Sequence, residues 1–152
     1  RFCLKVGDFG LSRVLPSHSE VYDPAPGEVV RFAYKWAAPE VFEHRRFSRS
    51  SDVYAGGITF WELFTDGAEP FPGMNYRTVR QLLQLPRVPL PAPLWIPEEL
   101  WAIITTCFQP MSDRPGYREL HKLFSSFLRL RQAQDQVDAA TLASSASSAS
   151  SA

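Results

Sequence analysis

The triplet Asp8-Phe9-Gly10 is the part of this sequence best suited to chemistry. The residues before it, Leu-Lys-Val-Gly at positions 4–7, predict a short strand closed by a glycine. A carboxylate at the end of such a strand can bind a hard cation such as Mg²⁺, which prefers oxygen ligands. The alternative is that Asp8 only begins a turn with Gly10.

A second informative triplet, Ala38-Pro39-Glu40, follows about thirty residues later and comes directly after Lys35-Trp36 and Ala37. The two triplets resemble the two ends of the activation segment of protein kinases. Other segments match the kinase family in the expected order, and they are residues 47–54, 61–65, 67, 70–74, 90–93, 97–100, 107–108 and 113–115. The resemblance extends over about residues 4–130.

Two details place the resemblance among the protein-tyrosine kinases. Lys35-Trp36 before the second triplet is typical of tyrosine kinases rather than serine/threonine kinases. Residues 7–13 and 46–48 are similar to cytoplasmic members such as the focal adhesion, Janus and Ack groups, without a choice among them.

The resemblance implies a mainly α fold, the protein-kinase-like C-lobe, with the N-lobe absent. It implies a parent enzyme that transfers the γ-phosphoryl group of ATP to tyrosines of protein substrates, with ATP and magnesium as cofactors. Asp8 would be the metal ligand, and residues 31–40 would shape the substrate platform. The implied activation-segment residues are Phe9, Gly10, Tyr22, Lys35, Trp36, Pro39 and Glu40.

The resemblance also assigns roles to three charged residues. Glu40 and Arg114 match an internal ion pair beneath the activation segment, and a guanidinium can bind a carboxylate through two parallel hydrogen bonds. The alternative is two unrelated surface charges. Asp52 matches the aspartate that anchors the catalytic loop by accepting its backbone N–H groups. Alternatively, Asp52 is an acidic residue stabilised by the dipole of the helix that it begins.

Tyr22 lies in a polar segment that contains proline and glycine, where tyrosine kinases carry an activating phosphotyrosine. The alternative is an ordinary exposed tyrosine. His18, His44 and His121 are scattered and lack the spacing of metal ligands.

Several elements of a complete kinase do not precede Asp8 in this sequence. There is no Gly-rich loop, no strand lysine and no His-Arg-Asp loop. The resemblance therefore implies that no catalytic residue lies within this chain and that the chain is inactive alone. We expect the missing elements upstream in the parent sequence. The alternative function is a non-catalytic binding module, pseudokinase-like or truncated, and a weaker one is a helical interaction domain with chance motifs.

Four positions depart from the family pattern. Tyr54 and Phe108 replace tryptophans, Gly56 replaces an aromatic residue, and Ala33 replaces a proline. A glycine inside a helix costs about 1 kcal/mol relative to alanine. Gly56, Ala33 and the missing front half of the kinase domain favour the binding module, whereas the presence of Asp8 and Glu40 favours the enzyme.

Composition limits the class of protein. The 152 residues are 45% hydrophobic, which is enough for one core, and the formal net charge of zero gives no support for a nucleic-acid partner. Cys3 and Cys107 are too few and too distant for a disulfide scaffold or a metal site. No apolar run is long enough to span a membrane. We expect a cytoplasmic protein and leave its oligomeric state open.

Hydrophobic periodicity predicts four helices, over residues 51–65, 76–85, from Pro97 to about 108, and 117–134. Ser51 is the expected N-cap of the first helix and Gly67 its C-terminal stop. The second helix should bury Val79, Leu82 and Leu83; in the third, Pro97 suits the first helical position and Trp101, Ile104 and Phe108 form the expected buried stripe. Residues 86–97 are proline-rich and predict an extended connector. We expect a partial kinase domain over residues 1–135. Residues 136–152, rich in alanine and serine, predict a disordered tail.

Overall fold

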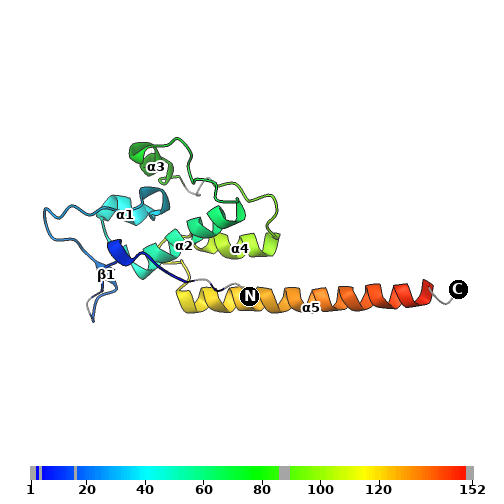
Figure 1. Ribbon diagram of the computed structural model, residues 1–152. Coiled ribbons are helices and arrows are strands. Elements are labelled where there is room, and N and C mark those ends of the chain that lie inside the picture. Colours follow the sequence, from blue (N-terminus) through cyan, green and yellow to red (C-terminus); the bar gives the residue numbers. More distant parts are fainter. Residues whose placement is uncertain (1–2, 4, 16, 86–89, 150–152) are drawn as a thin grey trace.

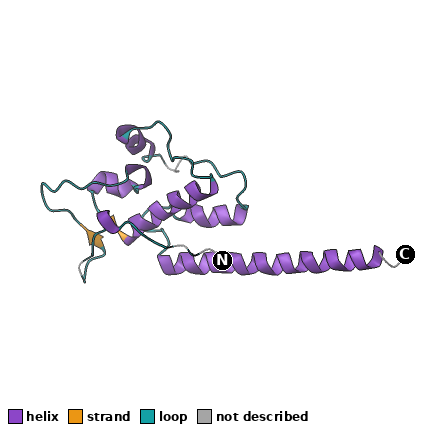
Figure 2. Ribbon diagram, viewed as in Figure 1, coloured by secondary structure: helices purple, strands orange, loops and turns teal. Residues whose placement is uncertain are grey.

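The computed structural model describes residues 3, 5–15, 17–85 and 90–149, with side chains placed as far as residue 142. Within these residues the fold is mainly helical (Figures 1 and 2), as predicted. The helices are η1 (Phe9–Leu11), η2 (Tyr34–Trp36), α1 (Pro39–His44), α2 (Arg49–Phe64), α3 (Tyr76–Leu82), α4 (Glu98–Thr106) and α5 (Tyr117–Ala149). The short strands β1 (Val21–Tyr22) and β2 (Phe47–Ser48) pair antiparallel, with Tyr22 opposite Phe47. No helix in the described part of the chain has the length and apolarity needed to cross a bilayer.

The central helix α2 has well-defined ends. It begins at Arg49, two residues before the predicted start, because Ser48 rather than Ser51 is the N-cap. The Ser48 side chain accepts a hydrogen bond from the Ser51 backbone N–H, while the Ser51 hydroxyl accepts one from the Ser48 N–H, which forms a capping box. At the other end Gly67 has φ 80° and its N–H donates to the Glu62 carbonyl over 2.9 Å, so the predicted glycine stop is confirmed.

Two hydrophobic clusters lie on different sides of α2. Tyr54 and Ile58 belong to the larger cluster, which α1 and α3 complete, whereas Val53 belongs to a smaller cluster with Cys107 and Leu120. Figure 1 shows α1 and α3 on one side of α2 and α5 on the other. Phe108 packs against both clusters, so α2 and the end of α4 join the two parts of the core.

The two adjacent glycines of α2 have different surroundings. A Cβ on Gly57 would lie 2.7 Å from Cys107 Cβ and 2.7 Å from Phe108 Cε1, so glycine is needed where α2 meets the end of α4. A Cβ on Gly56 would meet nothing within 4 Å. The close approach of the helices therefore explains Gly57 and leaves Gly56 without a packing reason.

The predicted helices over 76–85 and 97–108 are present with shifted ends. α3 ends at Leu82, and its buried side chains Val79 and Leu83 match the predicted face. In α4, Pro97 is the N-cap rather than the first helical residue. Its buried residues are Leu100, Ile104 and Cys107, whereas the predicted Trp101 and Phe108 are only half-buried. Both Cys107 and Phe108 approach α2 closely at Gly57, but only the smaller Cys107 is fully buried there.

Helix α5 is longer than predicted. It continues through Ala149, so residues 136–149 are helical where the sequence predicted disorder, and residues 150–152 lie outside the described part. Residues 117–149 contain no glycine or proline, and alanine has the highest helix propensity. From residue 128 to 142 every side chain is exposed, so contact with the core ends near Phe127.

Two predicted segments differ in part from the structure. Residues 5–7 form no strand, since no neighbouring strand pairs with them among the described residues, and Leu4 lies outside those residues. Residues 90–97 contain no helix or strand, but a turn at 94–95 and a bend at 96 interrupt the predicted extended connector, and residues 86–89 lie outside the described part.

Candidate functional site

Asp8 stands at the start of η1 with its side chain in solvent. Its backbone is left-handed, with φ 57° and ψ 67°, and its carboxylate makes no cap hydrogen bond. Mg²⁺ bound with nucleotide phosphates takes one or two protein carboxylates and keeps several waters, so Asp8 could supply only part of its coordination. No group of three or more His, Cys, Asp or Glu side chains in the described residues could hold a metal ion. The residues present therefore do not complete a magnesium site, and the role of Asp8 as a metal ligand stays a prediction.

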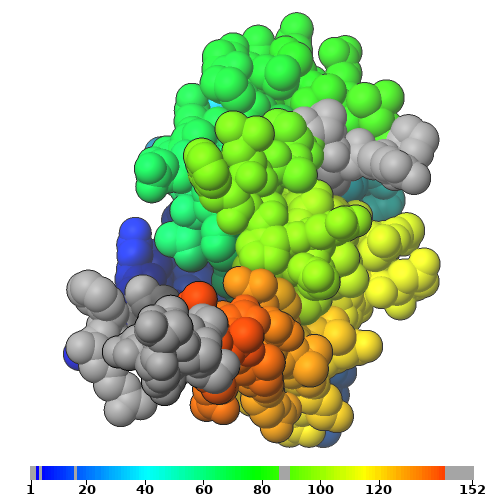
Figure 3. Space-filling view, turned by 90° about the vertical axis from the view of Figure 1, so that its right-hand side faces the viewer, coloured from blue at the N-terminus to red at the C-terminus, as the bar shows by residue number. Residues whose placement is uncertain are grey.

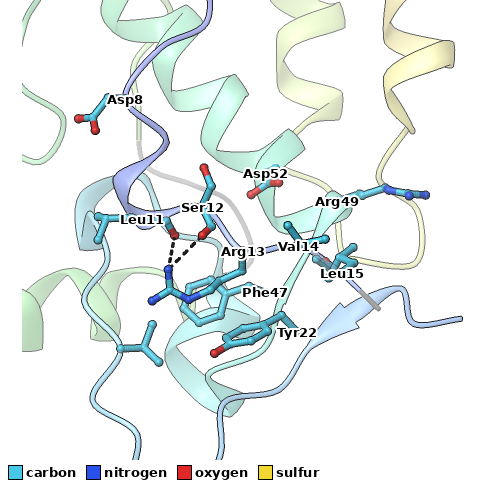
Figure 4. Close-up of a pocket in the computed structure, with 12 residues that line it drawn as sticks. Asp8, Leu11, Ser12, Arg13, Val14, Leu15, Tyr22, Phe47, Arg49 and Asp52 are labelled. Carbon is cyan, nitrogen blue, oxygen red and sulfur yellow. Dashed lines mark hydrogen bonds between the residues drawn. The ribbon is translucent and has the colours of Figure 1, made fainter. Parts of the chain in front are cut away.

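Asp8 and Asp52 line one open cavity of about 640 Å³ (Figure 4). Arg13 lies between η1 and β1, and its guanidinium donates to the backbone carbonyls of Leu11 and Ser12 over 3.3 and 3.0 Å. Although Asp52 is exposed, the protein atoms around it desolvate its carboxyl group and raise its pKa. The other residues that line the cavity are Val14, Leu15, Tyr22, Val30, Phe47, Ser48 and Arg49.

Tyr22 closes a small loop at the edge of this cavity. Its hydroxyl donates to Glu28 Oε1 over 2.8 Å, and the Ala25 N–H donates to Glu28 Oε2 over 3.1 Å. These two hydrogen bonds, together with the positive charge of Arg13, lower the pKa of Glu28. The Arg13 guanidinium also lies 5.9 Å from the centre of the Tyr22 ring. The loop is thus held by a carboxylate that a phosphate on Tyr22 would repel.

The segment around Lys35 and Trp36 is fixed to the helical core rather than to the cavity. The buried Lys35 ammonium donates to the Phe71 carbonyl over 3.0 Å and lies 2.9 Å from Glu69 Oε1. The Trp36 indole N–H donates to Glu62 Oε2 over 3.2 Å. Sequence reasoning missed Glu62, Glu69 and Phe71, because no local pattern indicates a partner about thirty residues away.

Glu40 and Arg114 are in direct contact, at the base of α1. Arg114 Nη1 lies 2.7 Å from Glu40 Oε1 and Nη2 lies 3.3 Å from Oε2, a bidentate arrangement. The guanidinium also donates to the carbonyls of Ser50 and Gln109, and it lies 5.2 Å from the centre of the Tyr54 ring. The Arg114 side chain is 1% exposed, so this cation depends on protein acceptors for its stabilisation.

The predicted site residues do not form one site. Asp8, Tyr22 and Asp52 line the cavity, whereas Phe9 and Gly10 lie in η1 and do not line it. The remaining residues, Lys35, Trp36, Pro39 and Glu40, belong to η2 and α1. Arg114 joins α1, through Glu40, to the segment just before α5.

The sequence matches a known protein family. The model of the protein tyrosine and serine/threonine kinase family matches residues 1–124. The chain belongs to that family. The matched range contains both triplets and the Glu40–Arg114 pair.

The individual relatives are tyrosine kinases. The chain is 35% identical over 136 residues to the tyrosine-protein kinase transforming protein Abl of Abelson murine leukemia virus, covering 89% of this chain and 18% of the relative. It is 37% identical over 125 residues to the tyrosine-protein kinase Src64B of Drosophila melanogaster, covering 81% of this chain and 22% of the relative. The tyrosine-protein kinase Srms of Mus musculus is 36% identical over 127 residues, which cover 82% of this chain and 24% of Srms. The chain spans less than a quarter of these three relatives.

Proposed function

We propose that this chain is the C-lobe of a protein-tyrosine kinase, and that the full-length protein transfers the γ-phosphoryl group of ATP to tyrosines of protein substrates. The bidentate Glu40–Arg114 pair is the observation that best supports this function, since it ties the end of the activation segment to the helical core of a family member. ATP with magnesium, when bound to the full-length protein, supplies the group that is transferred. A cytoplasmic location is part of the same proposal.

The residues of this chain have supporting roles in that enzyme. Asp8 contributes one metal ligand from the edge of the cavity. Residues 31–40 support the substrate, because Lys35 and Trp36 fix that segment to the core. Asp52 anchors a catalytic loop supplied by the upstream sequence, whose N–H groups would offset the desolvation of its carboxylate.

We also propose that the 152-residue chain alone transfers no phosphate. Its sequence contains neither the strand lysine that holds the phosphates nor the loop aspartate that accepts the proton of the substrate hydroxyl. A non-catalytic binding module remains the second candidate, and Gly56 favours it. The open space next to that glycine lies where the family pattern has an aromatic side chain.

The experiment compares the 152-residue chain with the full-length protein in a magnesium-dependent transfer assay, using labelled ATP and a tyrosine peptide. We expect transfer by the full-length protein, none by the chain, and none by full-length Asp8→Asn. Asp66→Asn is the matched control, because Asp66 is also exposed with a positive φ, 59°, but does not line the cavity. A folded full-length protein that fails to transfer phosphate would contradict the enzyme and leave the binding module. Transfer by the chain alone would contradict the inactivity.

A further inference from the structure

The connector between α3 and α4 exposes two large apolar side chains next to each other. Leu94 is 92% exposed and Trp95 is 90% exposed. Figure 3 looks onto the face where the connector and α4, in yellow-green, reach the surface. Single exposed apolar residues are common, but an adjacent leucine and tryptophan leave a large apolar area in water that a partner surface can cover.

The turn that carries these side chains is anchored on both sides. Before it, the Trp61 indole N–H donates to the Pro91 carbonyl over 2.8 Å, and Trp61 itself is buried in α2. Within it, Pro93 is buried and its carbonyl accepts from the Ile96 N–H over 3.4 Å. After it, α4 begins at once. The two apolar side chains are therefore presented on a fixed backbone, which lowers the entropy lost on binding.

Acidic residues follow the turn directly. Glu98 and Glu99 are exposed, and residues 90–113 contain no lysine, arginine or histidine; the nearest basic residue before the turn in the sequence is Arg87. Two copies of the turn placed face to face would bring these carboxylates together, which is unfavourable. An anionic membrane surface would repel them as well. A complementary surface is apolar at its centre and basic at its rim.

We propose that Leu94 and Trp95 form a docking knob for a partner protein with an apolar pocket rimmed by lysine or arginine side chains. Tryptophan is among the residues that contribute most to binding when buried in a partner's pocket. Neither knob residue lines the cavity that contains Asp8, so the knob does not depend on the proposed enzymatic function.

The test begins with the full-length protein in cells, with a photo-crosslinking amino acid in place of Leu94. The crosslinked protein is then purified, and its affinity for the 152-residue chain is measured by calorimetry. We expect Trp95→Ala to weaken binding at least about 30-fold and Leu94→Ala to weaken it by a smaller factor. Val29→Ala is the matched control, because Val29 is 87% exposed elsewhere on the surface, and it should change affinity less than about twofold. The double variant Glu98→Gln/Glu99→Gln should reduce both the association rate and its dependence on salt.

Other outcomes would overturn the proposal. Crosslinks that form only to a second copy of this chain would do so. Binding to phosphatidylserine vesicles instead of to a protein would also do so. So would crosslinked partners that all bind Trp95→Ala as tightly as the unchanged chain. A partner bound equally well in high and low salt would contradict the basic rim. The unfolding midpoint of each variant is measured as a control for folding, and we expect it to stay unchanged because these side chains are exposed. A lost interaction then reflects lost binding rather than lost folding.

Discussion

Replacing Arg114 with alanine is expected to cost about 3–5 kcal/mol of the free energy of unfolding, the range for breaking a buried ion pair. The guanidinium, 1% exposed, donates to Glu40, Ser50 and Gln109. Alanine leaves all these acceptors without their donor. Glu40 is 15% exposed, so water can solvate part of its charge, and we expect the loss near the lower end of the range.

Two further variants separate charge from geometry. Arg114→Lys keeps the positive charge but cannot donate from two parallel nitrogens, so it should lose stability without reaching the loss of alanine. Glu40→Gln combined with Arg114→Ala removes both charges. We expect the double variant to lose less than the sum of the single losses, with a coupling of about 0.5–3 kcal/mol.

The assay is urea unfolding followed by tryptophan fluorescence, with the slope against urea compared between variants. An unchanged slope with a lower midpoint would show a loss of stability without a change in the unfolding reaction. A loss within about 0.5 kcal/mol for Arg114→Ala, as for an ordinary surface residue, would refute a buried pair that stabilises the chain.

Four other outcomes follow from single side chains. Gly57→Ala should destabilise the chain by about 1–3 kcal/mol through overpacking, whereas Gly56→Ala should stabilise it by up to about 1 kcal/mol. Equal effects of the two variants on thermal unfolding would contradict this difference in packing. Tyr54→Phe should leave stability unchanged or raise it by about 1 kcal/mol, since the buried hydroxyl has no hydrogen-bond partner within the described part of the chain. A clear loss of stability in urea unfolding would indicate that the hydroxyl does have a partner. Burial raises the pKa of Cys107 from 9.0 to about 11, so the folded chain keeps a proton that the unfolded chain loses. Stability should therefore fall as pH rises above 9.0, and Cys107→Ala should weaken that fall in alkaline unfolding curves. Tyr22 should be phosphorylated in cells, and phosphosite mapping that finds other tyrosines modified but never Tyr22 would count against its role as a switch.

Local patterns in the sequence predicted the helical elements well. The polar residues before α2 and the glycine after it act through hydrogen bonds within a few residues, so their chemistry is visible in the sequence. The prediction of Ser51 as the N-cap was wrong, because Ser48 can cap as well and only the backbone conformation decides which serine does. The extension of α5 was missed because low hydrophobicity indicated disorder, although alanine also favours a helix.

The candidate site was only partly predictable. The resemblance to the kinase family supplied Glu40 and Arg114, which are 74 residues apart and which no periodicity connects. It could not supply Glu69 and Phe71 as partners of Lys35, since the contact depends on how η2 packs against the turn before α3. Gly57 and Gly56 look alike in the sequence, and the positions of Cys107 and Phe108 in the fold distinguish them.

The shared position of Phe108 has a consequence for how the chain unfolds. Its ring lies 5.4 Å from that of Tyr54 on the side of the larger cluster, and it also packs against the cluster that holds α5. Opening either cluster exposes the same ring, so neither can open without weakening the other. Amide protons of α2 and α4 should therefore exchange with solvent together, in one cooperative event rather than two. Shortening this one side chain would allow the α5 side of the core to exchange independently of the side that holds α1 and α3.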